Sequence, residues 1–205
     1  MLRDGDSLVQ RYAVLGMDHR HADLLEPLAR DAGHPLHREA IKAMEWGFEE
    51  RRFQALKIAA LSHPDPSLRE TAANVLLWDE PVAAEGPLLA ALDDTEERVA
   101  ASAANTLQYS AEDAIPRLAK LAAHDEREPL RLHAIYALTR LDAARAIEPL
   151  LSLLEAPPLM TWSVHVALLE ACRTLDLAPR GLDALREVDN LDVQQAITRI
   201  GRPSS

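Results

Sequence analysis

A repeat of about 31 residues runs along the chain and limits its possible folds more than any other feature of the sequence. Four nine-residue blocks begin at Leu36, Leu68, Val99 and Leu130. Positions 1, 5, 8 and 9 of each block are apolar, with Thr106 as the one exception, and this spacing places them on one face of a helix. Because alanine lets two helix backbones approach closely, its presence at position 5 predicts tight helix packing at Ala40, Ala72, Ala103 and Ala134.

A second apolar run precedes each block, so each repeat predicts a helical hairpin. The first helices of these hairpins are expected at residues 24–29, 53–61, 88–92, 114–121 and 146–154. Four of them have a proline near their start, where its missing N–H does least harm: Pro27, Pro87, Pro116 and Pro149. Polar or proline residues precede the second helices, as expected of helix starts. A weaker fifth copy begins near Val164, and end helices are expected at 8–15 and 191–200.

Stacking of the hairpins follows from their size. A single hairpin cannot bury both of its apolar faces, so neighbouring hairpins must pack on one another. The composition agrees, because alanine and leucine dominate the apolar residues and aromatic residues make up only 4%. We therefore predict an all-α fold, an α-solenoid of about five to six helical hairpins. It would form a single domain over residues 1–205, with the best repeats at 20–175 and degenerate caps at 1–19 and 176–205.

Three segments carry a resemblance to a known family: residues 114–121, 130–138 and 146–151. They resemble the HEAT-like repeat of the phycobilisome lyases, and the resemblance extends over roughly residues 20–175. It implies a right-handed α-solenoid whose second helices line a concave surface, most commonly used to bind another macromolecule. The chain departs from the family where a glycine often closes the second helix. Gly47 is present, but the equivalent places hold Asp79, Ser110 and Leu141.

Counted from the first residue of each block, positions 4, 7 and 11 lie on the side of the second helix that the apolar residues leave free. They form the predicted partner-binding surface. These positions hold Glu39, Lys42, Trp46, Thr71, Asn74, Trp78, Ser102, Asn105, Tyr109, His133, Tyr136 and Arg140.

The aromatic residues of this surface allow two interpretations. Trp46, Trp78 and Tyr109, followed by Arg140, would form a ladder of residue types that are frequent at binding hot spots. Alternatively, the aromatic side chains fill the core, because the next position, usually aliphatic in the family, holds Gly47 in the first block and polar residues in the next two. For Asn74 and Asn105, which are poor helix formers, packing and ligand contact remain equal alternatives.

No motif predicts catalysis, a cofactor or a metal site. The sequence has eight histidines, four of them at His19, His21, His34 and His37. It lacks the paired His-Glu dipeptides with which the HEAT-like enzyme deoxyhypusine hydroxylase holds iron, so these histidines are expected in solvated turns. Nucleophile elbows and phosphate-binding glycine loops are also missing. The lone Cys172 is expected to be buried and inert.

The charge of the chain excludes some partners and favours others. A formal net charge of −11 disfavours nucleic acids and anionic membranes. Seven acids and no lysine or arginine lie between residues 79 and 97: Asp79, Glu80, Glu85, Asp93, Asp94, Glu96 and Glu97. They form either a solvated rim that suits helix N-termini or a surface that steers a basic partner. No membrane-spanning run or secretion signal is found, and a cytoplasmic location is expected.

The function expected from the sequence is non-enzymatic. The chain would bind another protein through the concave face, as an adaptor, scaffold, inhibitor or immunity protein, and its acidic flanks would suit a basic partner. The alternative, which the resemblance implies, is a subunit of a chromophore-lyase-like or metal-dependent HEAT-repeat enzyme.

Overall fold

The computed structural model describes residues 6–48, 50–78, 81–109, 114–141, 143–155, 161–177, 186 and 189–200. All regular secondary structure in these residues is helical, which confirms the predicted all-α fold. Contacts between residues divide the chain into two compact units, Met1–Thr106 and Leu107–Ser205. The single domain expected from the sequence stays a prediction.

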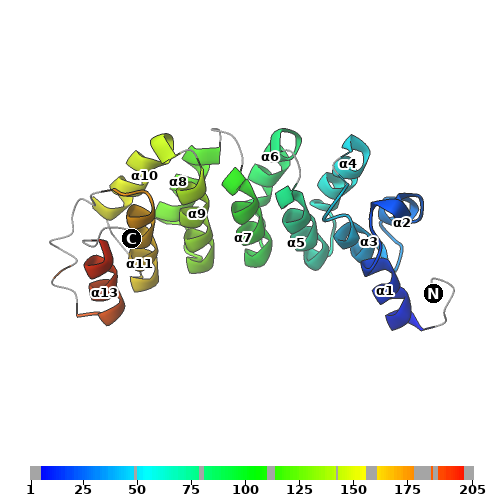
Figure 1. Ribbon diagram of the computed structural model, residues 1–205, viewed down its shortest axis with the longest axis horizontal. Helices are drawn as coiled ribbons and strands as arrows, with labels where there is room; N and C mark the ends of the chain where they lie inside the picture. Colours follow the sequence, from blue (N-terminus) through cyan, green and yellow to red (C-terminus); the bar gives the residue numbers. More distant parts are fainter. Residues whose placement is uncertain are drawn as a thin grey trace. The chain divides into compact units, whose positions relative to one another are not determined.

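The first unit contains a lone helix followed by three helical hairpins (Figure 1). Its α-helices are α1 (Ser7–Leu15), α2 (Ala22–Arg30), α3 (His37–Ala43), α4 (Arg51–Ala60), α5 (Pro66–Val75), α6 (Pro81–Ala91) and α7 (Glu97–Thr106). Short 3-10 helices lie at His19–His21 and Leu76–Trp78. The second helices of the hairpins pack on one another, α3 on α5 and α5 on α7. This is the stacking predicted from the repeat.

The second unit continues the pattern. It begins with a 3-10 helix, Leu107–Tyr109, and its α-helices are α8 (Ala114–His124), α9 (Glu128–Arg140), α10 (Ala143–Glu155), α11 (Trp162–Thr174) and α13 (Leu191–Ile200). Here α9 packs on α11, and α11 packs on α13 (Figure 1). Each unit therefore has the stacked-hairpin arrangement of the α-solenoid class.

The repeated alanines lie where the helices pack most closely. Ala40, Ala72, Ala103 and Ala134 are all fully buried, as their position in the repeat predicts. Thr106, the exception in the apolar pattern, is also buried, and its Oγ1 donates a hydrogen bond to the carbonyl oxygen of Ala73 at 2.7 Å. The hydroxyl is therefore satisfied by the preceding repeat, which is why a polar residue can stand at this core position.

Four helix starts share one local device. A side-chain acceptor at or just before the start of α5, α7, α9 and α13 binds the backbone N–H two residues further on, whereas α3 and α11 have no side-chain cap bond. The pairs are Asp65 with Ser67 at 2.9 Å, Asp94 with Glu96 at 2.9 Å, Asp125 with Arg127 at 2.9 Å and Asn190 with Asp192 at 3.1 Å. The bonds to Ser67 and Asp192 satisfy donors in the first turns of α5 and α13, and the bonds to Glu96 and Arg127 order the turns just before α7 and α9. These four starts are therefore encoded locally.

The chain reverses direction after α3 at a glycine. Gly47 has a φ of 78°, a conformation that side chains rarely adopt, and it follows Trp46 directly. The reversal leaves Trp46 60% exposed and brings Phe48, 1% exposed, into the core. There the ring of Phe48 packs edge-to-face on Phe53, with 5.0 Å between the centroids. The core-filling interpretation is therefore wrong for Trp46. The side chains of Trp78 and Tyr109 lie outside the described residues.

Candidate functional site

The second helices of the first unit enclose a groove of about 550 Å³. Three predicted residues line it, namely Lys42, Thr71 and Asn74. Lys42 and Asn74 are exposed, and no residue that the structure describes bonds to either side chain, so both offer donors to the groove. The Thr71 hydroxyl is already used, because it donates to the carbonyl oxygen of Ser67 at 2.8 Å. We call this cavity the first groove.

Two arginines that the sequence pattern missed also line the first groove. Arg98 is paired with Glu70 at 3.4 Å and donates to the Ser67 hydroxyl at 3.3 Å. Arg38 lies 3.4 Å from Glu39. Because Glu39 is buried and also pairs with Arg11 at 3.5 Å, its placement on a free binding surface is wrong. Its carboxylate holds α3 to α1, and it does not line the groove.

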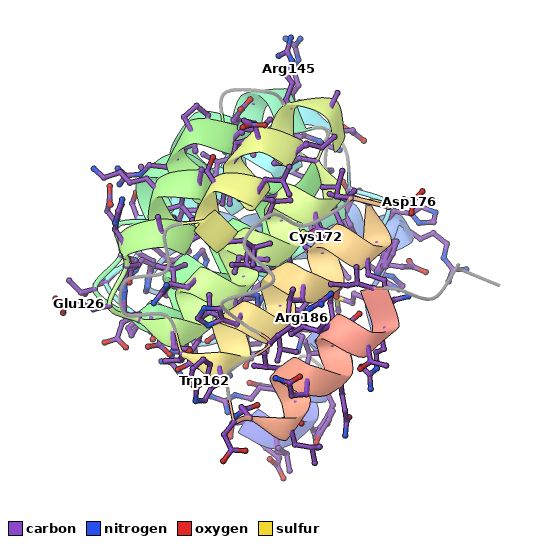
Figure 2. All side chains as sticks on the ribbon, turned by 90° about the vertical axis from the view of Figure 1, so that its left-hand side faces the viewer. Glu126, Arg145, Trp162, Cys172, Asp176 and Arg186 are labelled. Atoms are coloured by element: carbon purple, nitrogen blue, oxygen red, sulfur yellow. The ribbon has the colours of Figure 1, made fainter. Side chains whose placement is uncertain are left out.

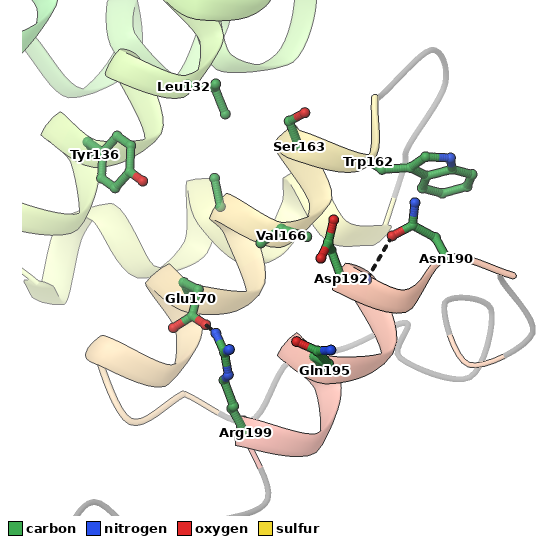
Figure 3. Close-up of a pocket in the computed structure, with 11 residues that line it drawn as sticks. Leu132, Tyr136, Trp162, Ser163, Val166, Glu170, Asn190, Asp192, Gln195 and Arg199 are labelled. Atoms are coloured by element: carbon green, nitrogen blue, oxygen red, sulfur yellow. Dashed lines mark hydrogen bonds and ion pairs between the residues drawn. The ribbon is translucent and has the colours of Figure 1, made fainter.

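A second groove of about 580 Å³ lies between α9, α11 and α13 of the second unit (Figure 3). Tyr136 lies at one end and Trp162 at the other, and both are strongly exposed, at 58% and 46%. Apolar side chains line part of the groove: Leu132, Val166 and Ala167. The polar lining residues are Ser163, Glu170, Asn190, Asp192, Gln195 and Arg199.

The charged residues of the second groove differ in how they are neutralised. Glu170 accepts hydrogen bonds from Arg173 at 2.7 Å and from Arg199 at 3.0 Å, and these bonds hold the pKa of its carboxyl below the usual range. Within the described part of the chain, no residue pairs with the Asp192 carboxylate. Asp192 therefore contributes a carboxylate without a direct side-chain partner to the groove, in the first turn of α13.

The other predicted residues whose side chains the structure describes line neither groove, except Tyr136. Ser102 and Asn105 are half-buried in α7, and His133 is half-buried in α9, where desolvation lowers its pKa. Arg140 is exposed at the end of α9. Of the predicted residues whose side chains the structure describes, only Tyr136 lines the second groove. Apart from Leu132 of α9, its other lining residues come from the degenerate copies, where the repeat alignment loses its register.

The amino-terminal histidines form a small structural cluster. His37 is buried, its Nδ1 is 3.2 Å from the carbonyl oxygen of Leu28, and its ring centroid lies 5.6 Å from that of His63. His34 and His63 each place Nδ1 where it can accept a backbone N–H two residues on. Over the described ranges, no three histidine, cysteine or acidic side chains are grouped so that they could hold a metal ion.

Burial makes His37 a source of acid sensitivity. Desolvation lowers its pKa from the ordinary value of 6.5, and the neighbouring His63 adds to the effect. Because the unfolded chain then binds a proton that the folded chain rejects, stability should fall as the pH drops below about 6.5. We expect His37→Asn, whose amide can still donate to Leu28, to reduce the fall in melting temperature between about pH 7.5 and pH 5.5. Equal falls in the two proteins would contradict this role.

Cys172 lies inside the second unit, whereas Arg145 projects outward (Figure 2). Burial raises the pKa of the Cys172 thiol to about 11. At neutral pH the thiol is therefore protonated and a poor nucleophile, in agreement with its predicted inertness.

The acidic stretch contains residues with different roles. Asp94 forms a two-pronged ion pair with Arg69, at 2.6 Å from Nε and 2.8 Å from Nη2. Asp93, Glu96 and Glu97 are exposed, whereas Asp79 and Glu80 lie outside the described residues. Asp94 therefore stabilises the fold. Its exposed neighbours Asp93, Glu96 and Glu97 remain available to attract a basic partner. None of the helices that the structure describes is long and apolar enough to cross a membrane.

Comparisons with known proteins agree with the helical architecture. Residues 84–168 match the family model for HEAT repeats. The structure is similar to that of the complex of CpcE and CpcF of phycocyanin lyase from Nostoc sp. PCC7120, with 17% identity and a TM-score of 0.54. This match covers 97% of the present chain and 90% of the other. An engineered protein matches with 18% identity and a TM-score of 0.51, covering 97% and 91%. No curated protein matches the chain. At these identities, the structural matches show the fold alone.

Proposed function

Because residues 84–168 match the family model for HEAT repeats, we propose that this chain binds another protein through the second helices of its hairpins. The observation that carries the proposal is the second groove, where Tyr136 and Trp162 remain strongly exposed beside polar groups. Large aromatic side chains at a groove are typical of binding hot spots. The first groove adds the unpaired donors of Lys42 and Asn74 on the second helices of the other unit.

The proposed mechanism is occlusion or scaffolding without a chemical step, as expected of an adaptor, a scaffold or an inhibitor. A partner that lies across α9, α11 and α13 would cover the second groove and bury the side chains of Tyr136 and Trp162. The similar CpcE–CpcF structure is itself a complex of two proteins, which supports a protein as the partner.

A second candidate function follows from the same comparison. The similarity to phycocyanin lyase favours a subunit that helps to attach or remove a chromophore. The two candidates differ in a simple observable, because a bound chromophore or iron centre would absorb light at wavelengths longer than the aromatic band. A purified chain that is colourless and still captures a protein would favour the binding function.

The proposal predicts that changes on the second helices abolish partner binding. We expect the triple variant Lys42→Ala, Asn74→Ala and Tyr136→Ala to lose at least about 2 kcal/mol of binding free energy, or roughly thirtyfold in affinity. The measurement is a pull-down from the source organism at low salt, followed by titration of the recovered protein against the wild-type chain and the variant.

A matched control places three substitutions on the first helices. Leu24, Arg51 and Lys120 are exposed on α2, α4 and α8 and line neither groove. The variant with alanine at these three positions should bind the partner like the wild-type chain. If both triple variants bind equally well, the second-helix face is not the binding surface.

A further inference from the structure

We infer that the second groove receives a positively charged side chain of the partner, an arginine or a lysine, and that Asp192 and Trp162 recognise it. The inference rests on the proposed function, because it names the chemistry of the partner at that site. It also explains why an acidic and an aromatic side chain lie at the same end of the groove (Figure 3).

The Glu170 carboxylate is already paired with two arginines, Arg173 and Arg199, so its charge is neutralised within the chain. Asp192 differs, because within the described ranges its carboxylate has no partner. The Asn190 side chain binds the backbone N–H groups of Asp192 and Val193, both at 3.1 Å, and this fixes the start of α13. The Asp192 carboxylate is therefore held at the groove by an ordered helix start.

Trp162 supplies the second element. Its ring contacts the buried His165, with 5.4 Å between the centroids, and the Nδ1 of His165 lies 3.1 Å from the carbonyl oxygen of Thr161. This contact supports the indole from within α11 while nearly half of the side chain stays exposed. An exposed indole face attracts a cation. The apolar side chains of Leu132 and Val166 can contact the aliphatic stem of a long basic side chain.

Other occupants fit the groove less well. An acidic segment would meet the Asp192 charge on a chain whose net charge is −11. A purely apolar segment would remove water from the Asp192 carboxylate and leave it unpaired, which is costly. A guanidinium group can donate two hydrogen bonds to a carboxylate and also stack on an aromatic ring, so arginine satisfies both elements together.

The test uses a defined probe and needs no knowledge of the natural partner. The probe is a short arginine–glycine peptide with both ends blocked, and the comparison is the same peptide with citrulline, a neutral isostere, in place of arginine. Binding is followed in the full chain by the NMR signal of the Trp162 indole N–H, assigned with Trp162→Phe. We expect a saturable shift with the arginine peptide and binding that is at least about threefold weaker with the citrulline peptide.

Matched variants separate a local site from the general acidity of the chain. Asp192→Asn should weaken binding of the arginine peptide about threefold to tenfold, whereas Asp192→Glu should restore most of it. Asp189→Asn is the control, because Asp189 is exposed three residues earlier and does not line the groove. Melting temperatures of the variants check that the fold is retained.

Three outcomes would overturn the inference. They are equal binding of the citrulline and arginine peptides, equal losses in Asp189→Asn and Asp192→Asn, and no shift of the Trp162 signal with either peptide. The proposed function fails separately, if the two triple variants of the pull-down bind the partner alike. If partner binding is lost in Tyr136→Ala but kept in Asp192→Asn, the proposed function stands. The inference that a basic side chain occupies the second groove is then refuted.

Discussion

Replacing Phe48 with alanine is expected to lower the free energy of unfolding by about 3–5 kcal/mol, because it leaves a cavity in a closely packed core. Phe48 is almost fully buried and packs edge-to-face on Phe53, which is 2% exposed. The loss therefore combines lost burial, an empty volume and a lost aromatic contact. Chemical denaturation of the wild-type and variant chains, monitored by circular dichroism, measures the difference.

The control for Phe48→Ala lies two residues earlier. Trp46 is larger, but 60% of it is exposed, so Trp46→Ala should change stability by no more than about 0.5 kcal/mol. The two substitutions remove aromatic rings from the two sides of Gly47 and should differ several-fold in their effect. A loss of stability in Trp46→Ala as large as in Phe48→Ala would mean that the indole fills the core after all.

Replacing Asp94 with alanine should lower the free energy of unfolding by about 3 kcal/mol, close to the effect of breaking a buried ion pair. The Asp94 and Arg69 side chains are only 11% and 16% exposed, and they meet through two hydrogen bonds. Asp94 also accepts the backbone N–H of Glu96, the residue just before α7, so the variant loses this turn bond as well. Arg69 would keep its bonds to the carbonyl oxygens of His63 and Pro64 but would lose its counter-charge.

Asp93→Ala is the matched control. Asp93 precedes Asp94 directly, has the same charge and is exposed, so its removal should cost about 1 kcal/mol or less in urea denaturation. Similar losses in the two variants would show that Asp94 acts only through its charge at the surface. A test of electrostatic steering should therefore replace Asp93, Glu96 and Glu97 and leave Asp94 in place.

The sequence alone predicts the helical hairpins, because the signals that form a helix are local. Apolar spacing within one helix predicts its buried face, and the alanines at Ala72 and Ala103 are fully buried as expected. Helix starts are equally local, since the side chain of Asp65 or Asp94 reaches a backbone N–H only two residues away. The stacking of the hairpins also follows, because one hairpin cannot bury its own apolar surface.

Three of the nine residues that line the first groove could be predicted in the same way, namely Lys42, Thr71 and Asn74. Lys42 and Asn74 occupy the same position in successive repeats, so equivalent sites on packed helices bring them together. The second groove could not be predicted, because Trp162 and Asp192 belong to degenerate copies that share no register with the clear repeats.

Only the tertiary structure decided which side chains of the predicted surface are free. Glu39 occupies an outward position by helical periodicity, yet Arg11 from α1 and Arg38 cover its carboxylate. The backbone turn at Gly47 leaves Trp46 exposed and places Phe48 in the core, which decides between the two interpretations of Trp46. Periodicity describes the faces of one helix, whereas exposure depends on what neighbouring repeats and turns place against each face. The sequence therefore determines the repeated hairpins, and the packing between them determines which side chains of the proposed binding surface are exposed.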